Sequence, residues 1–392
     1  MQRIIRAAKL ATWTLLLCSL AASTLLCRSV TCQQREPDDQ LLSRASLLQA
    51  ARLGGDYLVR MQKPDGSFHY IYNPVRGVFS ERQYNILRHT GSAICLLDLY
   101  DATRDQRYLG SAASAIKFLV TRVRPFEKNA AYVLDFDGKA KLGATGLALI
   151  AICKQSEAAA RPADLELARR LARFIVSQQR ADGGFESYWK VRGDEPSGSV
   201  SLFYPGEAML GLLTLHRMTK EPGLLDAARR GADFLIKTQR TRGLPPDAWF
   251  IQALERLYQI TPNSAYSGHA IDLAAAMIAN QIGEFEEGEQ DSEADLTDTR
   301  AAMVASRAEG MVAAYLLARK TGDKRADMIA THLRVSVRFQ LSQQYTMANT
   351  QGAKNPAMAL GGFRQGPAYG RIRIDYVQHN ISALLGVARA LY

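Results

Sequence analysis

The chain repeats one short phrase in two places, Gln62-Lys63-Pro64-Asp65-Gly66-Ser67-Phe68 and Gln179-Arg180-Ala181-Asp182-Gly183-Gly184-Phe185. Gln, Asp, Gly and Phe stand at matching offsets, and Leu360-Gly361-Gly362-Phe363 is a degenerate third copy. The first two copies each close a run of apolar residues with helical spacing. An Asp-Gly pair favours a turn after a helix, and the Phe can then fold back to staple one helical hairpin to another. The phrase therefore predicts a fold built from repeated helical hairpins.

Helical periodicity extends over almost the whole chain after residue 40, and no convincing period-two strand is present. Four of the predicted helices end with a Leu that is followed four residues later by a Thr, which could cap the next helix. The sequence thus predicts an all-α protein. Twelve helices are expected at 40–62, 84–101, 105–122, 143–154, 164–180, 204–218, 222–239, 247–259, 264–281, 300–319, 322–344 and 375–391.

Two kinds of helix alternate along this series. The run 224–235 is amphipathic and basic, so one of its faces can meet solvent. The runs 143–153 and 206–215 are rich in Gly and Ala and apolar nearly all round, which is typical of buried helices. Alternation of buried and half-exposed helices predicts an inner barrel wrapped by an outer one, with residues 40–392 forming a single (α/α)6 toroid of six helical hairpins. The chain would begin on an outer helix and end on an inner one.

The repeated phrase resembles the Gln, Gly and aromatic repeats of terpenoid-cyclase-type α/α toroids, and similar phrases in six-hairpin glycosidase-like proteins. The resemblance implies the (α/α)6 architecture for the domain. The six-hairpin glycosidase-like families include hydrolases, lyases and epimerases, so the resemblance does not choose a reaction.

The first 32 residues have the pattern of an export signal. Arg3, Arg6 and Lys9 precede an apolar run, 10–27, which corresponds to the positive and hydrophobic regions of a secretory signal. Residues 1–32 are therefore expected to be a signal peptide or an uncleaved signal anchor, and 33–39 a linker. Either version places the protein outside the cytoplasm, as a periplasmic, secreted or outward-facing membrane-anchored protein.

The composition is that of a globular protein, with 47% apolar and 22% charged residues. Removing residues 1–32 lowers the formal charge of +11 to about +7. This positive charge would suit an acidic partner such as a uronic-acid polymer, and the alternative is that it is ordinary solvated surface charge. Cys95 and Cys153 lie in apolar helical runs and are expected to be core residues. No P-loop, dinucleotide-binding fingerprint, nucleophile elbow or nucleic-acid-binding motif is present, so we expect no nucleic-acid partner and no cofactor.

Polar residues gather where the inner helices begin, at the mouth of the expected toroid. Glu207 and Asp247 are the first candidates for a catalytic carboxylate pair, because a glycosidase needs one acid and one base or nucleophile. In a lyase or epimerase, Tyr84 and His89 would abstract a proton instead. The expected substrate-binding residues are Arg88, Tyr204, Trp249, Arg307, Glu309, Asp375 and His379.

Each of these residues also has a structural interpretation. Asp and Glu are favoured at helix N-termini by capping and by the helix dipole, so Glu207 or Asp247 alone could be a cap. A toroid that binds a glycan or protein without catalysis, in cell-envelope assembly, would present the same mouth. The sequence lacks the Asp-rich motif of a protonating terpenoid cyclase and any Cys and His at zinc-ligand spacing, so we expect no catalytic metal. The function predicted first is acid/base chemistry on a poly- or oligosaccharide by an exported protein.

Overall fold

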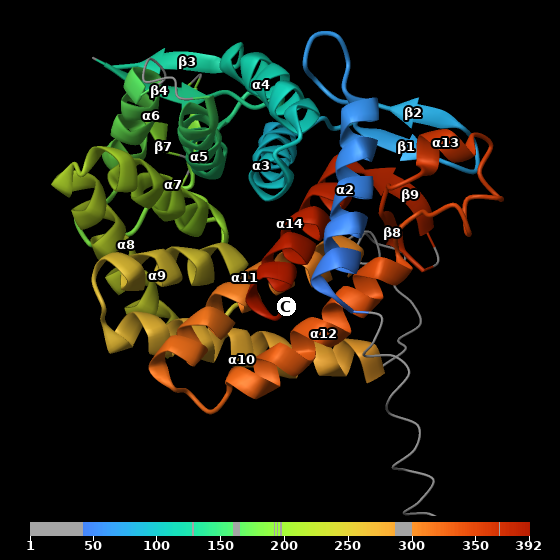
Figure 1. The fold of residues 1–392 in the computed structure, drawn as a ribbon. Coiled ribbons are helices and arrows are strands. Elements are labelled where there is room, and N and C mark those ends of the chain that lie inside the picture. The colour runs from blue at the N-terminus through green and yellow to red at the C-terminus, as the bar shows by residue number, and fades with distance from the viewer. Residues whose placement is uncertain are drawn as a thin grey trace, which may run out of the picture. The chain divides into compact units, whose positions relative to one another are not determined.

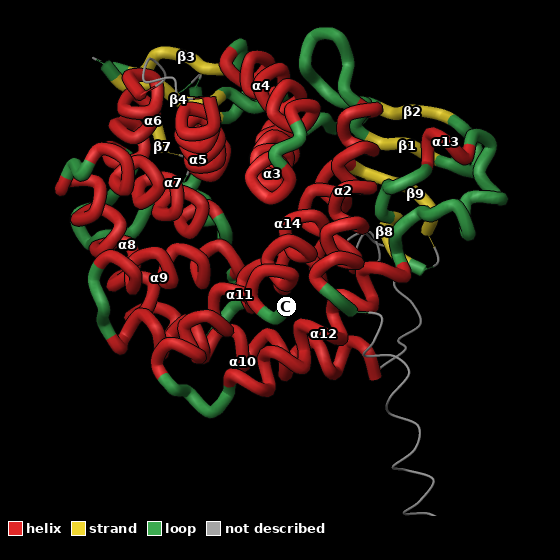
Figure 2. Tube along the Cα trace, in the orientation of Figure 1, coloured by secondary structure: helices red, strands yellow, loops and turns green. Residues whose placement is uncertain are grey.

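The computed structural model describes residues 42–127, 129–159, 165–191, 193, 195–196, 198–286, 300–367 and 369–392 of the chain. The expected signal segment 1–32 and linker 33–39 lie outside the described residues. The chain divides into two units, Met1–Ser46 and Leu47–Tyr392. In the described end of the first unit, the backbone N–H of Ser46 donates to Oγ of Ser43. The second unit contains the toroid and is drawn in Figures 1 and 2.

Twelve long helices and one short helix, α13 (Pro356–Ala359), make up most of the described chain. Each long helix overlaps one of the twelve predicted runs, so the periodicity analysis is confirmed. The long helices are α2 (Arg44–Met61), α3 (Ile86–Thr103), α4 (Gln106–Val120), α5 (Leu142–Ala159), α6 (Leu165–Ser177), α7 (Tyr204–Thr219), α8 (Pro222–Arg242), α9 (Ala248–Ile260), α10 (Ser264–Glu286), α11 (Arg300–Thr321), α12 (Ala326–Ser342) and α14 (Ile374–Ala390).

Six of these helices form a closed inner ring. Helices α3, α5, α7, α9, α11 and α14 pack in that order, and α14 returns to α3 (Figure 1). Glycines allow the close approach, since a Cβ on Gly146 of α5 would lie 2.7 Å from the carbonyl oxygen of Glu207 on α7. Helices α4, α6, α8, α10 and α12 each pack outside the inner helix that precedes them. The described chain is therefore an (α/α)6 toroid, as predicted.

The first described helix completes the sixth hairpin. A Cβ on Gly54 of α2 would lie 3.0 Å from Ile381 of α14, and one on Gly55 would lie 2.4 Å from Leu99 of α3. Helix α2 therefore packs against both the last and the first helix of the inner ring. Among the described helices, α11 is long and apolar enough to cross a membrane, and most of it is buried as a member of that ring.

Short antiparallel strands decorate the toroid, and the sequence analysis did not predict them. They form a four-stranded sheet in the order β2-β1-β9-β8, the pair β3-β4 and the sheet β5-β6-β7. Each has only two to five residues, too few to display a period of two. Their bounds are β1 (Ile71–Asn73), β2 (Val78–Ser80), β3 (Val123–Phe126), β4 (Ala130–Val133), β5 (Ala140–Lys141), β6 (Tyr188–Lys190), β7 (Glu195–Pro196), β8 (Arg364–Gly366) and β9 (Tyr369–Arg373).

The repeated phrase staples pairs of outer helices, and its glutamine makes the polar contacts. In the first two copies, the Gln side chain spans from the end of one outer helix to a backbone carbonyl of another, linking α2 to α4 and α6 to α8. The third copy, 360–363, has no Gln of its own, and Gln344 at the end of α12 takes that place and links α12 to α2. The Phe of each copy is buried and forms a backbone bridge to its Gln. Nε2 of Gln62 donates to the carbonyls of Gly66 and Ser111, at 3.3 and 2.9 Å. Nε2 of Gln179 donates to those of Gly183 and Ala227, at 3.0 and 2.9 Å. Nε2 of Gln344 donates to those of Gly361 and Ala50, at 3.3 and 2.9 Å.

The threonine turns act differently from the prediction. The hydroxyl of Thr103 donates to the carbonyl of Leu99, four residues earlier on its own helix, at 2.7 Å. Thr219 and Thr321 bond back to their own helices in the same way. The cap of α4 is Asp105, whose carboxylate accepts from the N–H of Arg107. These threonines therefore close the preceding helix, and the predicted capping of the next helix is wrong for α4.

Candidate active site at the mouth of the inner ring

Charged side chains from α3 and α14 meet at the N-terminal end of the inner ring. Asp375, in the first turn of α14, receives two bonds from the Arg373 guanidinium, at 2.6 and 3.0 Å. Nε of Arg88 lies 3.2 Å from the same carboxylate, and its Nη1 donates to the Tyr70 hydroxyl at 2.6 Å. Burial alone would raise the pKa of Asp375, but Arg373 and Arg88 outweigh it and hold that pKa below its usual value. Two cations around one carboxylate leave a net positive charge at this point.

A histidine and a carboxylate pair beside these charges. Nδ1 of His379, on α14, lies 2.7 Å from Oε1 of Glu309 on α11, and the Gln378 amide lies 3.1 Å from the same nitrogen. Nε2 of His379 makes no hydrogen bond to a described residue, and the side chain is 18% exposed. Part of the His379 side chain is therefore accessible to solvent.

The electrostatics of this pair favour a titrating imidazole. Burial lowers the pKa of His379, but the neighbouring Glu309 carboxylate outweighs it, and the net pKa is raised above 6.5. Burial raises the pKa of Glu309 against the opposing effect of His379. Asp375 and Arg88 also act on His379, so the charges belong to one group. We call it the His379 cluster: Arg88, Glu309, Arg373, Asp375 and His379.

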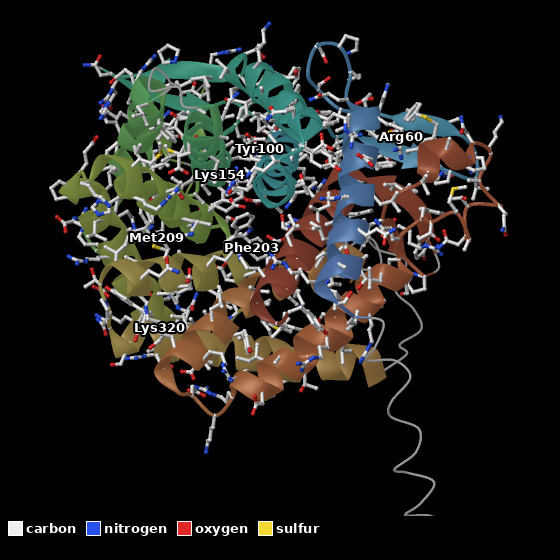
Figure 3. The ribbon with its side chains drawn as sticks, viewed as in Figure 1. Arg60, Tyr100, Lys154, Phe203, Met209 and Lys320 are labelled. Carbon is white, nitrogen blue, oxygen red and sulfur yellow. The ribbon has the colours of Figure 1, made fainter. Side chains whose placement is uncertain are left out.

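Aromatic side chains occupy the opposite wall of the ring, where α7 and α9 lie across from α14 and α3. Phe203, just before α7, is 42% exposed, and Figure 3 labels it toward the centre of the ring. Trp249, in the first turn of α9, is half-buried, and its Cβ would lie 3.0 Å from a Cβ on Gly206 of α7. Tyr204 is half-buried with its ring 5.3 Å from that of Tyr188. The sequence analysis identified Trp249 and Tyr204 but missed Phe203, because an exposed Phe gives no periodic signal.

Glu207 and Asp247 form a buried carboxyl pair between these two helices. Oδ1 of Asp247 accepts from the N–H of Phe250 at 3.0 Å and so caps α9. Oε2 of Glu207 and Oδ2 of Asp247 are buried without a hydrogen-bond partner. Burial, and then the charge of Asp247, raise the pKa of Glu207 to about 8. Burial raises the pKa of Asp247 to about 7, against the backbone hydrogen bonds that lower it.

This carboxyl pair is sealed from the mouth. Glu207 and Asp247 are 5% and 0% exposed. A Cβ on Gly143 of α5 would lie only 1.8 Å from Oε2 of Glu207, so that helix closes the remaining side. The structure brings the two predicted catalytic carboxyls together but leaves no room beside them for a sugar.

Tyr84 lies just before α3, and His89 lies on the side of α3 that faces α4. Both belong to the hydrogen-bond network around the first repeated phrase, residues 62–68. The Tyr84 hydroxyl donates to Nδ1 of His89 at 2.8 Å and accepts from the N–H of Phe68 at 3.0 Å. Nε2 of His89 donates to the carbonyl of Ala115 at 2.9 Å. Burial lowers the pKa of His89 to about 4, so the imidazole is neutral, and burial raises the pKa of Tyr84. The Tyr84 hydroxyl and both ring nitrogens of His89 are therefore hydrogen-bonded within the protein, so neither side chain has a polar atom left for a substrate.

Arg307 lies away from the His379 cluster. Arg307 is buried on α11. The pKa of His332 on α12 is lowered by the burial of that histidine and then by the charge of Arg307. The charges that act on Glu309 come instead from His379 and Asp98. The structure thus gathers the predicted residues Arg88, Glu309, Asp375 and His379 on one wall and Tyr204 and Trp249 on the other.

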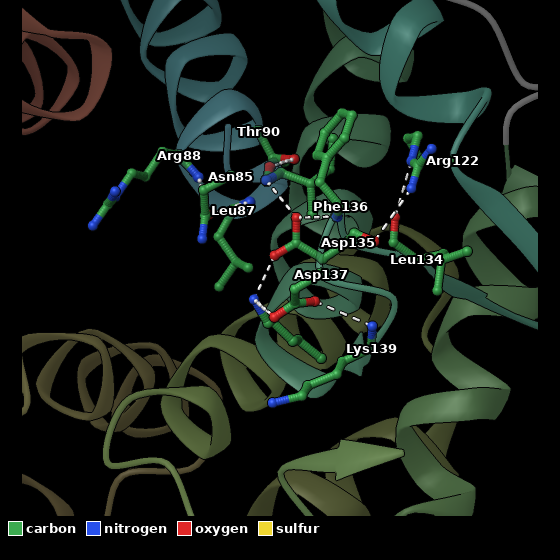
Figure 4. A network of polar contacts seen from close by, with 12 residues as sticks. Asn85, Leu87, Arg88, Thr90, Arg122, Leu134, Asp135, Phe136, Asp137 and Lys139 are labelled. Carbon is green, nitrogen blue, oxygen red and sulfur yellow. Dashed lines mark hydrogen bonds and ion pairs between the residues drawn. The ribbon is translucent and has the colours of Figure 1, made fainter. Parts of the chain in front are cut away.

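A carboxylate that the sequence analysis missed holds the start of α3 in place. Oδ1 of Asp135, in the loop before α5, accepts from the backbone N–H of Ile86 at 3.0 Å and of Phe136 at 2.7 Å. Its Oδ2 accepts from Nζ of Lys141 at 2.5 Å, and Asp137 binds the same ammonium at 2.8 Å (Figure 4). This network fixes the helix turn that carries Arg88. Its residues lie in a loop without periodicity, and only their mixed charge could have indicated it.

Metal binding finds no support among the described residues, where no three His, Cys, Asp or Glu side chains gather closely enough to hold an ion. Cys95 and Cys153 are free and buried, and burial raises the pKa of both thiols, that of Cys153 to about 12. Two surface hollows lie elsewhere, one between α6 and α8 and one beside β3. The mouth is therefore the candidate site because of its charged and aromatic side chains, and not because of a surface hollow.

No protein-family model matches the sequence, and no curated protein does either. Solved structures do match. An α-1,6-mannanase, GH76A of Salegentibacter sp. HEL1_6, inactivated at two adjacent aspartates and bound to α-1,6-mannotetrose, has a TM-score of 0.64 at 15% identity, covering 88% of this chain and 99% of that one.

Two sugar-converting enzymes match equally well. Cellobiose 2-epimerase from Bacillus thermoamylovorans B4167 has a TM-score of 0.64 at 11% identity, over 88% of this chain and 99% of that one. A D-mannose isomerase has a TM-score of 0.62 at 13% identity, over 89% and 98%. At such identities the likeness shows the fold alone, the (α/α)6 toroid that these solved structures share.

Proposed function

We propose that this chain is an exported carbohydrate-acting enzyme that moves a proton on a sugar through His379, in a reaction of the epimerase or isomerase type. The observation that carries the proposal is the His379–Glu309 pair. Nδ1 is held 2.7 Å from a carboxylate, while Nε2 makes no hydrogen bond to a described residue and the side chain is partly exposed. The fold likeness to a cellobiose 2-epimerase and a mannose isomerase supports the same class of substrate.

The pair can act as an oriented general base. With the proton on Nδ1 donated to Glu309, the lone pair of His379 is on Nε2 and faces the substrate. Nε2 would take the proton on the carbon next to the carbonyl of an open-chain sugar and return it to the same or the neighbouring carbon. The negative charge that develops on the sugar oxygens would be stabilised by the net positive charge of Arg88, Arg373 and Asp375.

The walls of the mouth suit a saccharide. Phe203 and Trp249 present aromatic surface across the ring from His379, and such surface packs well against the apolar face of a pyranose. The net positive charge beside Arg88 would also accept the carboxylate of a uronate-containing oligosaccharide. The proposal therefore covers neutral and uronate-containing poly- or oligosaccharides.

Hydrolysis has a weaker basis in the geometry. A glycosidase needs two carboxyl groups that flank the scissile bond of a bound sugar, whereas Glu207 and Asp247 are closed off by α5. A non-catalytic binding toroid would not need a histidine oriented by a carboxylate at its mouth. Export rests on the residue pattern of 1–32 alone.

Deuterium exchange tests the proposal. The protein would be incubated in D₂O with cellobiose, mannose, manno-oligosaccharides and oligouronates, and the products read by mass spectrometry and NMR. We expect deuterium at the carbon next to the carbonyl, lost in His379→Asn and retained in the control His69→Asn, whose side chain lies at the surface. Products of bond cleavage without deuterium on carbon would refute proton transfer and favour hydrolysis.

A further inference from the structure

Two arginines contact Asp375 at the mouth, and they use their guanidinium groups differently. Arg373 donates from Nε and Nη2 to the two oxygens of that carboxylate, at 2.6 and 3.0 Å. Its guanidinium carbon also lies 4.5 Å from the centre of the Tyr376 ring, and only 13% of its side chain is exposed. Arg373 is therefore a buried partner that neutralises Asp375.

Arg88 is held at two corners of its guanidinium group. Its Nε lies 3.2 Å from Oδ2 of Asp375, and its Nη1 donates to the Tyr70 hydroxyl at 2.6 Å. Nη2 makes no hydrogen bond to a described residue, and 34% of the side chain is exposed. Figure 4 shows Arg88 extending away from Asp135 and its partners. Arg88 is thus the more accessible of the two cations, and its Nη2 is available to a ligand.

Tyr70 holds the second corner of Arg88, and Tyr70 is itself fixed in place. Its backbone carbonyl accepts from the N–H of Ile374, the first residue of α14, at 3.2 Å. Strand β1, which follows Tyr70, pairs with β9, which leads into α14. The Tyr70 side chain is buried, and its ring lies 5.0 Å from that of Tyr84. The Tyr70 hydroxyl therefore has a fixed position between the start of α14 and the start of α3.

Direct contacts connect the first turns of α3 to the turn of α14 that carries the proposed base. Asp375, which binds Nε of Arg88, lies one turn before His379, so these two side chains share a face of α14. In the next turn of α3, a Cβ on Gly91 would lie 2.7 Å from Oε1 of Gln378. The amide nitrogen of Gln378 lies 3.1 Å from Nδ1 of His379. Packing and hydrogen bonds thus place Arg88 beside His379.

We propose that Tyr70 is a positioning residue that fixes the Arg88 guanidinium, so that its free Nη2 edge binds the sugar oxygen on which negative charge develops beside His379. When Nε2 of His379 takes the proton from carbon, the C–H electron pair forms a carbon–carbon double bond and the carbonyl oxygen becomes negative. A donor that is already oriented stabilises this charge best. A guanidinium held at Nε alone can turn, which would remove that orientation.

Tyr70→Phe tests the inference because it keeps the ring and releases Nη1 of Arg88. The kinetic part of the inference rests on the proposed function. We expect kcat for deuterium exchange on the sugar to fall about tenfold with KM unchanged, because the ordered donor acts in the transition state. Arg88→Met should lower kcat about a hundredfold. Adding Tyr70→Phe to Arg88→Met should change nothing further, because Tyr70 acts through Arg88.

Tyr108→Phe is the matched control. Tyr108 is as buried as Tyr70, and its hydroxyl lies 3.1 Å from both the carbonyl of Arg52 and Oδ1 of Asp56, on the outer helix α2. This variant removes a buried tyrosine hydroxyl that lies outside the mouth. It should lose about as much Tm as Tyr70→Phe and keep both kcat and KM.

NMR of the Arg88 guanidinium gives a second measurement that needs no substrate. The signals of the ¹⁵N-labelled full chain are assigned from their loss in Arg88→Met. A held guanidinium gives separate Nη1 and Nη2 signals, whereas one that turns freely gives an averaged signal. We expect separate signals in the wild type and in Tyr108→Phe, and an averaged signal in Tyr70→Phe.

A fall in kcat that disappears in the Arg88→Met background supports the inference. An unchanged kcat in Tyr70→Phe, an equal fall in Tyr108→Phe, or a fall that persists with Arg88→Met would overturn it. If Tyr70→Phe does not fold, Arg88→Lys decides, because a lysine keeps the charge but cannot bind at two corners; wild-type kcat in that variant would overturn the inference. If the wild type turns over no sugar, the proposed function fails, while the Nη signals still decide whether Tyr70 holds Arg88.

Discussion

The outer layer and the mouth of the toroid use their residues in opposite ways. In the outer layer, three Gln-and-Gly phrases adopt the same geometry, with Gln62, Gln179 and Gln344 each bonded to a turn carbonyl and to another outer helix. At the mouth, the six inner helices begin with six different sets of side chains. The repeated residues thus stabilise the ring, whereas the residues that differ from one inner helix to the next form the candidate site.

The staple glutamines and the mouth differ in their hydrogen bonding. The staple amides donate all the bonds that their positions allow, which stabilises the fold. The mouth instead contains Nε2 of His379, which bonds to no described residue, and two buried carboxyl oxygens without partners lie behind its wall, between α7 and α9. Such groups are costly for stability and are tolerated where they serve a function.

The staple glycines offer the largest expected effect. Gly361 has φ +86°, and a Cβ there would lie 2.0 Å from the carbonyl oxygen of Leu53, so Gly361→Ala should destabilise the fold by about 3 kcal/mol or more. Gly138 has φ +79° with open space around it, so Gly138→Ala should cost only about 1 kcal/mol. Urea unfolding of both variants measures the difference, and equal losses would show that the close approach of the staple is unimportant.

The buried carboxyl pair predicts a pH dependence of stability. The folded pKa of Glu207, about 8, lies above its ordinary value. Between the ordinary pKa of a glutamate and about 8, the folded state therefore binds more protons than the unfolded state. The free energy of unfolding is highest at acid pH and falls as the pH rises through this range to 8. Glu207→Gln should remove its share of this slope, of the order of a few kcal/mol, and leave the share of Asp247, whose folded pKa is raised to about 7. Unfolding between pH 5 and 9 measures it, and an unchanged slope in the variant would assign it to other groups.

The staple glutamines should affect stability and not chemistry. Gln179→Leu leaves the carbonyls of Gly183 and Ala227 without their donor and should cost about 2 kcal/mol. Gln106→Leu, at an exposed position on α4, is the control and should stay within about 0.5 kcal/mol of wild type. A loss of turnover per folded molecule in Gln179→Leu would break the separation of the two regions.

The aromatic wall offers the smallest effect. Phe203→Ala should raise KM for an oligosaccharide about tenfold with little change in kcat, because the lost contact binds ground and transition states alike. Tm should hardly move, since the ring is 42% exposed. A fall in kcat with KM unchanged would instead place Phe203 beside the reacting atoms.

Sequence periodicity identified the helices and the ring because twelve long runs each carry many apolar positions. The short strands were missed because two to five residues contain too little pattern. The candidate site was found only in part, for a geometric reason. Helix α3 is apolar nearly all round, so its sequence does not tell which side faces the interior, and His89 was assigned to the mouth although it points toward α4. Arg88, one residue earlier, does reach the mouth.

His89 and His379 can be compared directly, since both lie in the first two turns of an inner helix. We would measure Tm and sugar turnover for His89→Asn and His379→Asn side by side. We expect His89→Asn to lose about 2 kcal/mol of stability and to keep its turnover per folded molecule. We expect His379→Asn to keep its Tm and to lose about a thousandfold in kcat. Equal turnover losses in both variants, or none in His379→Asn, would show that His379 is not the catalytic base.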